Sequence, residues 1–357
     1  MTRHSSWRWR RAGVVAIAAV AAATLLAACS SGTGGSTGGT TKKIGIIIDS
    51  TQTGWGPLQG TVAQALAKKR GWTTVILDAK NDPATFSKDV TTLIQDKVDA
   101  VVGFIQETGA APAAAKRFGA AKIPVITYDI AQPGWYFVGI DNAASGKLNG
   151  EALGQLVKTK WNCQVDLVME GHATQVGVID TQRTGGEADG LASVCPNIPK
   201  SAFQNFETAG SATTGLPAAR NLLTANPTAK NIVAVGINDP SVEAALDAHK
   251  QLGGDSQIIG WGQDGSLIGT SGASSEMAGS AFYFLESYPY YAFQLLDKIV
   301  AGTAPKASAA DTSSNGVLIK PCVVTAEQAK SIPDINARAT KVGSTDKSPY
   351  DLFCPVK

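Results

Sequence analysis

Short apolar runs alternate with amphipathic stretches from residue 42 to about residue 301, and this alternation restricts the fold more than any other feature. Residues 44–48 are apolar and rich in β-branched side chains, which is typical of a strand buried on both faces. Residues 57–70 then predict a helix, because Pro57 suits its first turn and Gly71 suits its end. Repetition of this unit predicts right-handed crossovers that build a parallel sheet covered by helices.

The alternation continues through two series, one on each side of residue 142. The further predicted strands cover 75–77, 100–104, 125–128, 137–140, 165–169, 203–206, 232–235 and 258–261. The further predicted helices cover 83–97, 110–118, 145–160, 176–194, 215–225, 240–251 and 289–301. We therefore expect two similar three-layer α/β domains with mainly parallel sheets, each with its own core.

Residues 1–28 have the layout of a secretory signal. Four arginines precede an uncharged run of Ala, Val and Leu at 12–28. A membrane-spanning anchor is the alternative, but this run of 17 residues, many of them Ala, lies at the lower end of the spanning range. Leu-Ala-Ala-Cys at 26–29 resembles the lipobox of bacterial lipoproteins, in which the cysteine is lipidated and becomes the new N-terminus. We predict lipidation of Cys29; a chance cysteine after a secretory cleavage site is the alternative.

Residues 30–41 are all Ser, Gly or Thr, a composition that behaves as a flexible coil spanning about 19 Å. With Cys29 they predict a tether (29–41) between a membrane lipid and an exported body on the outer face of the cell membrane. The whole chain has 31 basic and 29 acidic residues, and four of the basic residues lie in 1–28. The remaining body is therefore weakly acidic, without the clustered basic face that nucleic-acid binding requires.

Four cysteines remain after Cys29: Cys163, Cys195, Cys322 and Cys354. An even number in an exported protein predicts two disulfides, for which three pairings exist. We favour 163 with 195 and 322 with 354, since each pair closes a loop of about 30 residues within one supersecondary unit. A metal site is the alternative, but the four are scattered, without a C-x-x-C motif or a nearby histidine. We expect no metal and no cofactor.

Motifs in both halves of the chain carry a family resemblance. The first half has Ile-Gly-Ile-Ile-Ile at 44–48, Ile-Pro-Val-Ile-Thr-Tyr-Asp at 123–129 and Val-Gly-Ile-Asp-Asn at 138–142, followed by Gly146 and Gly150. The second half has Asn-Leu-Leu-Thr-Ala-Asn-Pro at 221–227, Ala-Val-Gly-Ile-Asn-Asp at 234–239, Ile-Gly at 259–260 and Asp-Gly at 264–265. In order and spacing these motifs resemble the ribose-binding-protein group of type I periplasmic binding proteins, over roughly residues 42–321.

The resemblance implies a receptor of an ABC importer that binds a small sugar or sugar-like polyol between two domains and presents it to a membrane permease. It implies a three-segment hinge, with crossings near Asn142, near Tyr283 and at 313–317. The expected domains are 42–142 plus 283–315 and 143–282 plus 316–330, followed by a tail at 331–357 that wraps the surface. We expect a monomer. Delivery of the ligand to a membrane sensor is the alternative role.

Loops at the carboxyl ends of parallel strands are where ligand-binding residues are expected. A sugar presents adjacent hydroxyls and an apolar C–H face, so carboxylates, amides, guanidinium groups and flat rings suit it. Asp129 and Asp264 have a turn role as the alternative, and Asn238 a helix-capping role. The candidate ligand-binding residues are Asp49, Gln52, Thr53, Trp55, Gln106, Glu107, Asp129, Arg183, Asn238, Gln263, Asp264 and Tyr283.

This sequence departs from the pentose receptors of the family at three places. They carry an Asp-Arg pair where this chain has Asp129-Ile130, Arg183 is off the family register by about half a turn, and residues 262–263 are inserted before Asp264. We therefore expect a solute other than a pentose in the usual pose. Trp135 and the aromatic run at 282–284 are candidates for reshaping the pocket.

Enzymes are the main alternative to a receptor. Residues 54–60 suggest a dinucleotide fingerprint, but Gln59 stands where the motif needs its last Gly. The chain has no G-x-S-x-G motif for a serine hydrolase. Glu107 and Asp129 would suit a glycosidase only at a separation that sequence does not give. We expect a non-catalytic protein.

Overall fold

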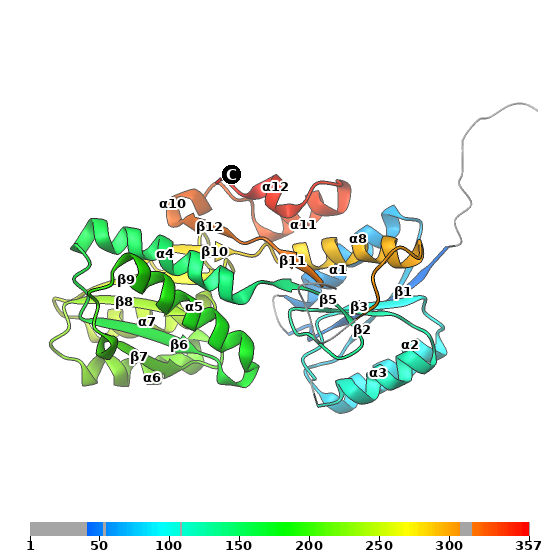
Figure 1. The fold of residues 1–357 in the computed structure, drawn as a ribbon, viewed down its shortest axis with the longest axis horizontal. Coiled ribbons are helices and arrows are strands. Elements are labelled where there is room, and N and C mark those ends of the chain that lie inside the picture. Colours follow the sequence, from blue (N-terminus) through cyan, green and yellow to red (C-terminus); the bar gives the residue numbers. More distant parts are fainter. Residues whose placement is uncertain (1–40, 53–54, 108, 308–315, 357) are drawn as a thin grey trace, which may run out of the picture. The chain divides into compact units, whose positions relative to one another are not determined.

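The structure is a computed structural model, which describes residues 41–52, 55–107, 109–307 and 316–356. The expected signal peptide, Cys29 and almost all of the tether lie outside the described residues, as does Thr53. The described chain forms two lobes, each built on a six-stranded sheet with helices on its faces (Figure 1). No helix within these ranges is long and apolar enough to cross a membrane.

The first lobe contains the sheet β11-β5-β4-β3-β1-β2, whose neighbouring strands are all parallel. Its strands are β1 (Lys43–Ile48), β2 (Thr73–Asp78), β3 (Ala100–Gly103), β4 (Val125–Tyr128), β5 (Tyr136–Ile140) and β11 (Gly316–Ile319). Its helices are α1 (Gly56–Lys69), α2 (Pro83–Gln95), α3 (Ala111–Ala120) and α8 (Ser287–Val300).

The second lobe contains the sheet β12-β10-β9-β8-β6-β7, in which only β12 is antiparallel to its neighbour. Its strands are β6 (Leu167–His172), β7 (Phe203–Glu207), β8 (Asn231–Gly236), β9 (Gln257–Asp264), β10 (Met277–Phe282) and β12 (Cys322–Thr325). Its helices are α4 (Asn142–Trp161), α5 (Val178–Val194), α6 (Ala212–Ala225) and α7 (Asp239–Leu252), with short 3₁₀ turns η1 (Thr174–Val176) and η2 (Lys200–Ala202). Two similar, mainly parallel α/β lobes confirm the predicted fold class.

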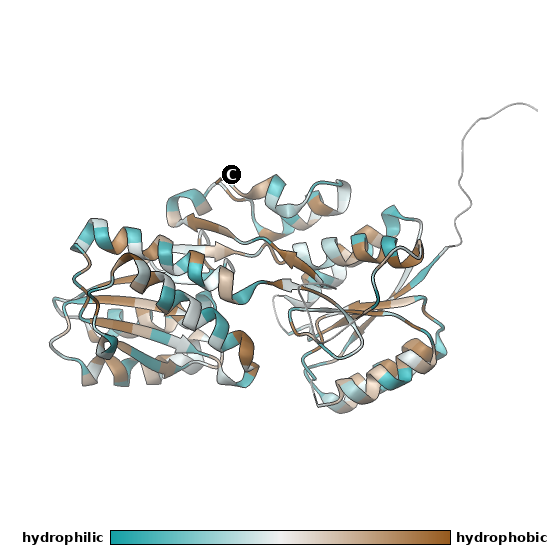
Figure 2. Cartoon of the chain, in the orientation of Figure 1, coloured by the Kyte–Doolittle hydropathy of each residue, from teal (hydrophilic) through white to brown (hydrophobic). Residues whose placement is uncertain are grey.

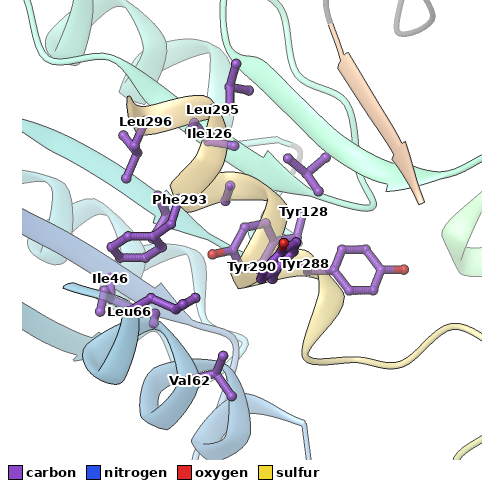
Figure 3. Packing of buried hydrophobic residues seen from close by; sticks show 14 of the residues in the cluster. Ile46, Val62, Leu66, Ile126, Tyr128, Tyr288, Tyr290, Phe293, Leu295 and Leu296 are labelled. Carbon is purple, nitrogen blue, oxygen red and sulfur yellow. The ribbon is translucent and has the colours of Figure 1, made fainter. Parts of the chain in front are cut away.

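Bulky side chains join the helices of the first lobe to its sheet. Helix α8 brings Tyr288, Phe293 and Leu296 into the same cluster as Leu66 of α1 and Ile46 of β1 (Figure 3). Figure 2 shows the same arrangement as hydropathy, with the apolar residues gathered on the strands and polar residues on the outer helix faces. This core fixes the ends of β1, β3 and β4, where the candidate residues lie.

Glycines join α4 to α5 in the second lobe. A Cβ at Gly150 would lie 2.1 Å from the Glu187 carbonyl oxygen, and one at Gly190 would lie 2.3 Å from that of Lys147. The two helix backbones therefore touch without a layer of side chains between them. The disulfide Cys163–Cys195 links the residues that follow the two helices, and Cys322–Cys354 is the second disulfide of the described chain, so both follow the favoured pairing.

The chain crosses between the lobes near residues 141 and 283, and again between Ile319 and Cys322. The expected third crossing at 313–317 is wrong by a few residues, because β11 pairs with β5 of the first lobe and not with the second sheet. Only Lys320 and Pro321 separate β11 from β12, so the apolar pattern does not show which strand belongs to which sheet.

The C-terminal segment contacts both lobes. It contains α10 (Ala326–Ala329), α11 (Ile335–Ser344) and α12 (Pro349–Phe353), which lie along the crossing strands in Figure 1. Helix α11 packs against α1 and places Ala339 and Val342 in the core of the first lobe, while α10 packs against β10 and β12. Residues 331–356 thus form helices that pack on both lobes, where the sequence predicted a tail that wraps the surface.

Candidate ligand-binding cleft

A cavity of about 980 Å³ is lined by loops at the carboxyl ends of strands from both lobes. The first lobe contributes residues that follow β1, β3 and β4, and the second lobe contributes residues that follow or end β6, β8 and β9. Parallel sheets direct these loops to one edge, so two such sheets facing each other create a shared site. We call the part of the cavity between these loops the cleft.

Asp129 is an acidic residue of the first-lobe wall that contacts both lobes. It follows β4 in a left-handed conformation, with φ of 55°. Its Oδ2 accepts a hydrogen bond from Arg183 Nη2 at 2.9 Å, and its Oδ1 accepts one from the Tyr288 hydroxyl at 3.1 Å. The carboxylate is therefore held by a cation from the opposite lobe and by an aromatic hydroxyl from its own.

Aromatic rings form the apolar part of the same wall. The ring of Trp55 stands edge-on to Phe104, at a centroid distance of 5.5 Å, and to Tyr288, at 5.1 Å. The Trp55 Nε1 is buried and makes no hydrogen bond within the part of the chain that the structure describes. Asp49, which is 2% exposed, and Gln106 also line this wall. The first lobe thus offers a flat indole flanked by polar groups.

Arg183 connects the second-lobe wall to the first lobe. It lies on α5, is 7% exposed, and donates from Nε to Asn142 Oδ1 at 2.7 Å as well as to Asp129. Its guanidinium carbon lies 4.9 Å from the ring centre of Tyr283, in the geometry of a cation–π contact. Asn142 and Tyr283 belong to two of the crossing segments. The guanidinium therefore joins α5, the hinge and the first lobe at one point.

Two interacting carboxyl groups lie in the second lobe, of which Asp239 is fully buried and Asp264 partly buried. Asp264 ends β9 with φ of 79°, lines the cleft, and accepts a hydrogen bond from Ser266 N at 2.8 Å. Asp239, fully buried at the start of α7, accepts from the backbone of Leu267 and Ile268 at 2.9 and 3.0 Å. Burial raises the pKa of both carboxyl groups, and their mutual repulsion raises that of Asp239 further.

A hydrogen-bonded network lies behind Tyr283 in the second lobe. Asn149 of α4 donates to Glu187 Oε1 at 2.7 Å and accepts from Trp261 Nε1 at 2.6 Å. The Tyr283 hydroxyl donates to Gln263 Oε1. Burial raises the pKa of Glu187 well above its usual value, which favours the neutral acid. These bonds tie α4, α5 and β9 together and hold the ring on which Arg183 stacks.

A model of the periplasmic binding protein domain family matches residues 44–304. The chain belongs to this family. The binding protein also aligns with the ribose import binding protein RbsB of Bacillus subtilis strain 168, with 29% identity over 202 residues. That alignment spans 55% of this chain and 61% of the relative, less than two thirds of its length.

Solved structures share the fold of this binding protein. An ABC transporter solute-binding protein from Actinobacillus succinogenes 130z with bound D-allose superposes with a TM-score of 0.65 and 20% identity, covering 81% of this chain and 99% of that one. One from Bacillus halodurans C-125 with bound myo-inositol gives a TM-score of 0.62 and 19% identity, covering 82% and 98%. At these identities the likeness concerns the fold.

Most of the candidate residues of the binding protein lie at the cavity. Those that line it are Asp49, Trp55, Gln106, Asp129, Arg183, Asn238, Asp264 and Tyr283. Asn238 also caps α7, since its Oδ1 accepts from Ser241 N at 3.0 Å, so the capping role and a place at the cavity hold together.

Other candidates lie away from the cavity. Gln52 is exposed on the surface, and Gln263 is fully buried under Tyr283. Glu107 is buried outside the lining, where burial raises its pKa. Trp135 packs against Phe118 in the first-lobe core and does not reshape the pocket.

Sequence reasoning missed an apolar group and a C-terminal group. The missed lining residues include Phe104, Ile130, Gln175, Val176, Ile179, Ile237, Leu285, Tyr288, Ile332, Pro333, Asp334, Ile335 and Arg338. Phe104, Ile130 and Ile237 lie within two residues of a strand end, so their positions were predictable from the strand ends. They were missed because mainly polar side chains were considered. The rule does not reach 332–338, which follow no strand of either sheet directly.

Proposed function

We propose that this protein is an exported receptor of an ABC importer that binds a small sugar or polyol between its lobes. The observation that carries the proposal is the ion pair between Asp129 and Arg183, which joins the two lobes inside a cavity lined by the strand ends of both. A solute that hydrogen-bonds to both side chains stabilises the arrangement in which the lobes meet, because it binds that arrangement best.

The chemistry of the cleft suits a polyhydroxylated ring. Asp129, Asp264 and Asn238 present oxygen atoms for hydroxyl donors, and Arg183 offers N–H groups for hydroxyl acceptors. Trp55 supplies an apolar face of the kind on which a sugar C–H face packs. Similar proteins support the same ligand class: one solved structure holds D-allose, another holds myo-inositol, and the aligned relative is a ribose import binding protein.

We further propose a lipid at Cys29 as the membrane anchor, a permease as the partner, and a monomeric receptor without catalytic activity. The Leu-Ala-Ala-Cys motif and the Gly/Ser/Thr tether support the anchor. Membership of the periplasmic binding protein family supports transport over catalysis.

Calorimetric titration of the purified mature protein with ribose, allose, glucose, galactose, myo-inositol and glycerol tests the proposal. We expect saturable binding of at least one compound at one site per chain, and the same compound recovered unchanged by chromatography. Conversion of the compound to a product would show that the protein is an enzyme and not a receptor. Absence of binding across the panel would reject a receptor for a sugar or polyol.

A further inference from the structure

The cavity extends past the cleft to the C-terminal segment, a wall that neither sheet supplies. We call this part the hinge chamber and define it by Ile268, Phe282, Leu285, Ile332, Ile335 and Arg338, all of which line the same cavity as Asp129 and Arg183. Leu285 lies in a crossing segment, Ile268 follows β9, and the last three come from the C-terminal segment. Four of the six are aliphatic, so most of this wall is apolar.

Ile332 and Ile335 place the hinge chamber between the two cores. Ile335, the first residue of α11, packs against the first-lobe core, whereas Ile332 packs against the second-lobe core. The disulfide Cys322–Cys354 joins the two ends of this segment, and α11 packs on α1 between them. The side chains of Ile332 and Ile335 are therefore each held against the core of one lobe.

Arg338 provides one polar group in the hinge chamber. It is 6% exposed, donates from Nε to Glu286 Oε1 at 2.6 Å, and donates from Nη1 to the Pro333 carbonyl oxygen at 2.8 Å. Its guanidinium carbon lies 5.5 Å from the centre of the Phe282 ring. Among the described residues, none accepts a hydrogen bond from its Nη2. The ion pair with Glu286 offsets the charge of Arg338, and Nη2 is left as a donor for a neutral oxygen.

The volume of the cavity and the character of its two parts indicate whether the ligand has one ring or two. A volume of about 980 Å³ is at the upper end of the range for sites that hold drug-sized molecules. A single sugar ring bound at Asp129 and Arg183 leaves water against Ile332 and Ile335, whereas a second ring removes their apolar surface from water. The hinge chamber also offers that ring one donor, Arg338 Nη2.

We propose that the ligand is a sugar linked to a second ring, with the first sugar ring in the cleft and the second ring in the hinge chamber. This inference rests on the proposed function and narrows its ligand class. The second ring is either another sugar, as in a disaccharide, or an aromatic group. Both present a ring face to the aliphatic wall and an oxygen or nitrogen acceptor to Arg338.

Calorimetry with matched ligands tests the proposal. Glucose, galactose and ribose are compared with disaccharides (maltose, cellobiose, lactose and melibiose) and with sugars carrying an aromatic ring (the 4-nitrophenyl glucosides and galactosides, and adenosine). We expect at least one two-ring ligand to bind at least ~10-fold more tightly than its single sugar. The set in which it occurs identifies the second ring. Equal affinities for single and two-ring ligands would overturn the proposal while leaving a sugar receptor in place; no binding of any ligand would overturn both.

Variants of α11 locate the second ring. Ile335→Trp fills the hinge chamber, so we expect it to remove the gain of the two-ring ligand and to leave the affinity for the single sugar unchanged. Asn336→Trp adds the same side chain at an exposed neighbouring position and should alter neither affinity. If Ile335→Trp does not fold, Ile335→Ala should lower the two-ring affinity several-fold with the single-sugar affinity unchanged. Unchanged two-ring affinity in the folded Ile335 variants would overturn the assignment of the hinge chamber.

Discussion

Asp129 and Asp264 occupy equivalent places in the two lobes but differ in their electrostatic surroundings. Each lies at the end of the third strand in the order of its sheet, and each has a left-handed backbone, with φ of 55° and 79°. Asp129 forms an ion pair with Arg183, whereas Asp264 forms no ion pair in the described structure and burial raises its pKa. At the same position of the fold, the Asp129 carboxylate thus has its charge balanced by Arg183 of the other lobe. The Asp264 carboxyl group forms no such ion pair among the described residues and can accept a hydrogen bond from a ligand hydroxyl.

The outer layers of the lobes differ as well. In the first lobe α1 packs against α8 through large side chains, including Tyr290 and Phe293, and against α11 through smaller ones such as Ala339 and Val342. In the second lobe α4 and α5 meet backbone to backbone at glycines. Bulky packing tolerates small displacements by rotamer changes, whereas backbone contact does not, so the second lobe should respond more sharply to added volume.

Removal of Arg183 should have the largest effect on binding and stability, because it removes the ion pair that distinguishes Asp129 from Asp264. We expect Arg183→Leu to weaken sugar binding by more than ~100-fold and to cost about 3 kcal/mol of unfolding free energy, since it leaves the partly buried Asp129 carboxylate without its cation. Calorimetry and urea unfolding measure the two effects. Arg220→Leu, at an exposed position of α6, is the matched control. Binding within ~3-fold of wild type would place Arg183 outside the site.

The second prediction compares the two aspartates directly. Asp264→Asn keeps a side chain that tolerates the left-handed backbone and removes the charge, so we expect affinity to fall by ~10–100-fold. Wild-type affinity should also weaken as the pH is lowered through the raised pKa of Asp264, because the protonated acid is a poorer acceptor. In Asp264→Asn this pH dependence should disappear. Calorimetry from pH 5 to pH 8 checks both, with Asp255→Asn at an exposed site as control; an unchanged pH profile would contradict the assignment.

The glycine contact between α4 and α5 gives the third prediction. Gly190→Ala places a Cβ 2.3 Å from the Lys147 carbonyl oxygen, and we expect a loss of about 1–3 kcal/mol of unfolding free energy. Gly185→Ala lies on the same helix with nothing within 4 Å of the added atom, so it should be neutral or stabilising by ~0.5–1 kcal/mol. Chemical denaturation of both variants measures the difference, and equal stabilities would show that the helices separate easily.

The smallest expected effect concerns the pH dependence of stability. The raised pKa of Asp239 means that its contribution to stability is complete below the ordinary value of 3.8 and is lost as the pH rises through its folded-state pKa. Asp239→Asn removes this titration and can still accept from Leu267 and Ile268 through its amide oxygen. We expect the loss of unfolding free energy between pH 5 and pH 8 to shrink by on the order of 1 kcal/mol. Thermal unfolding of both proteins at several pH values measures this difference. Parallel profiles of stability against pH would contradict a raised pKa at Asp239.

Much of the fold could be predicted from sequence because parallel strands are buried on both faces. Runs such as Ile44–Ile48 and Ile232–Val235 lie within strands β1 and β8. The loops after such strands contain most of the candidates that reach the cavity. Asp129 and Asp264 could therefore be selected from their places at strand ends, without knowledge of the residues that contact them. The crossings near Asn142 and Tyr283 were predicted from the family resemblance and not from a pattern in the residues themselves, and the sheet order places both where expected.

The remainder depended on tertiary contacts that leave a weak pattern. Strand β11 has four residues and precedes β12 by two, so pairing alone decides to which lobe each belongs. Helix α11 lies in the segment that was predicted as a surface tail. It nevertheless buries Arg338, because Glu286 compensates the charge of the guanidinium. Gln263 was expected at the ligand site but turns inward, since its partner is the Tyr283 hydroxyl.

The order of the crossings has a consequence for how the chain folds. The sheet of the first lobe is completed by β11, and its outer layer by α8 and α11, all of which come after nearly the whole second lobe in the sequence. In a chain that emerges with its N-terminus first, the segment from β1 to β5 cannot complete its lobe until more than 140 further residues, from Asn142 to Ser287, have also emerged. The second lobe, which by then lacks β12 and α10, can fold first, and the first lobe can then complete its sheet beside it.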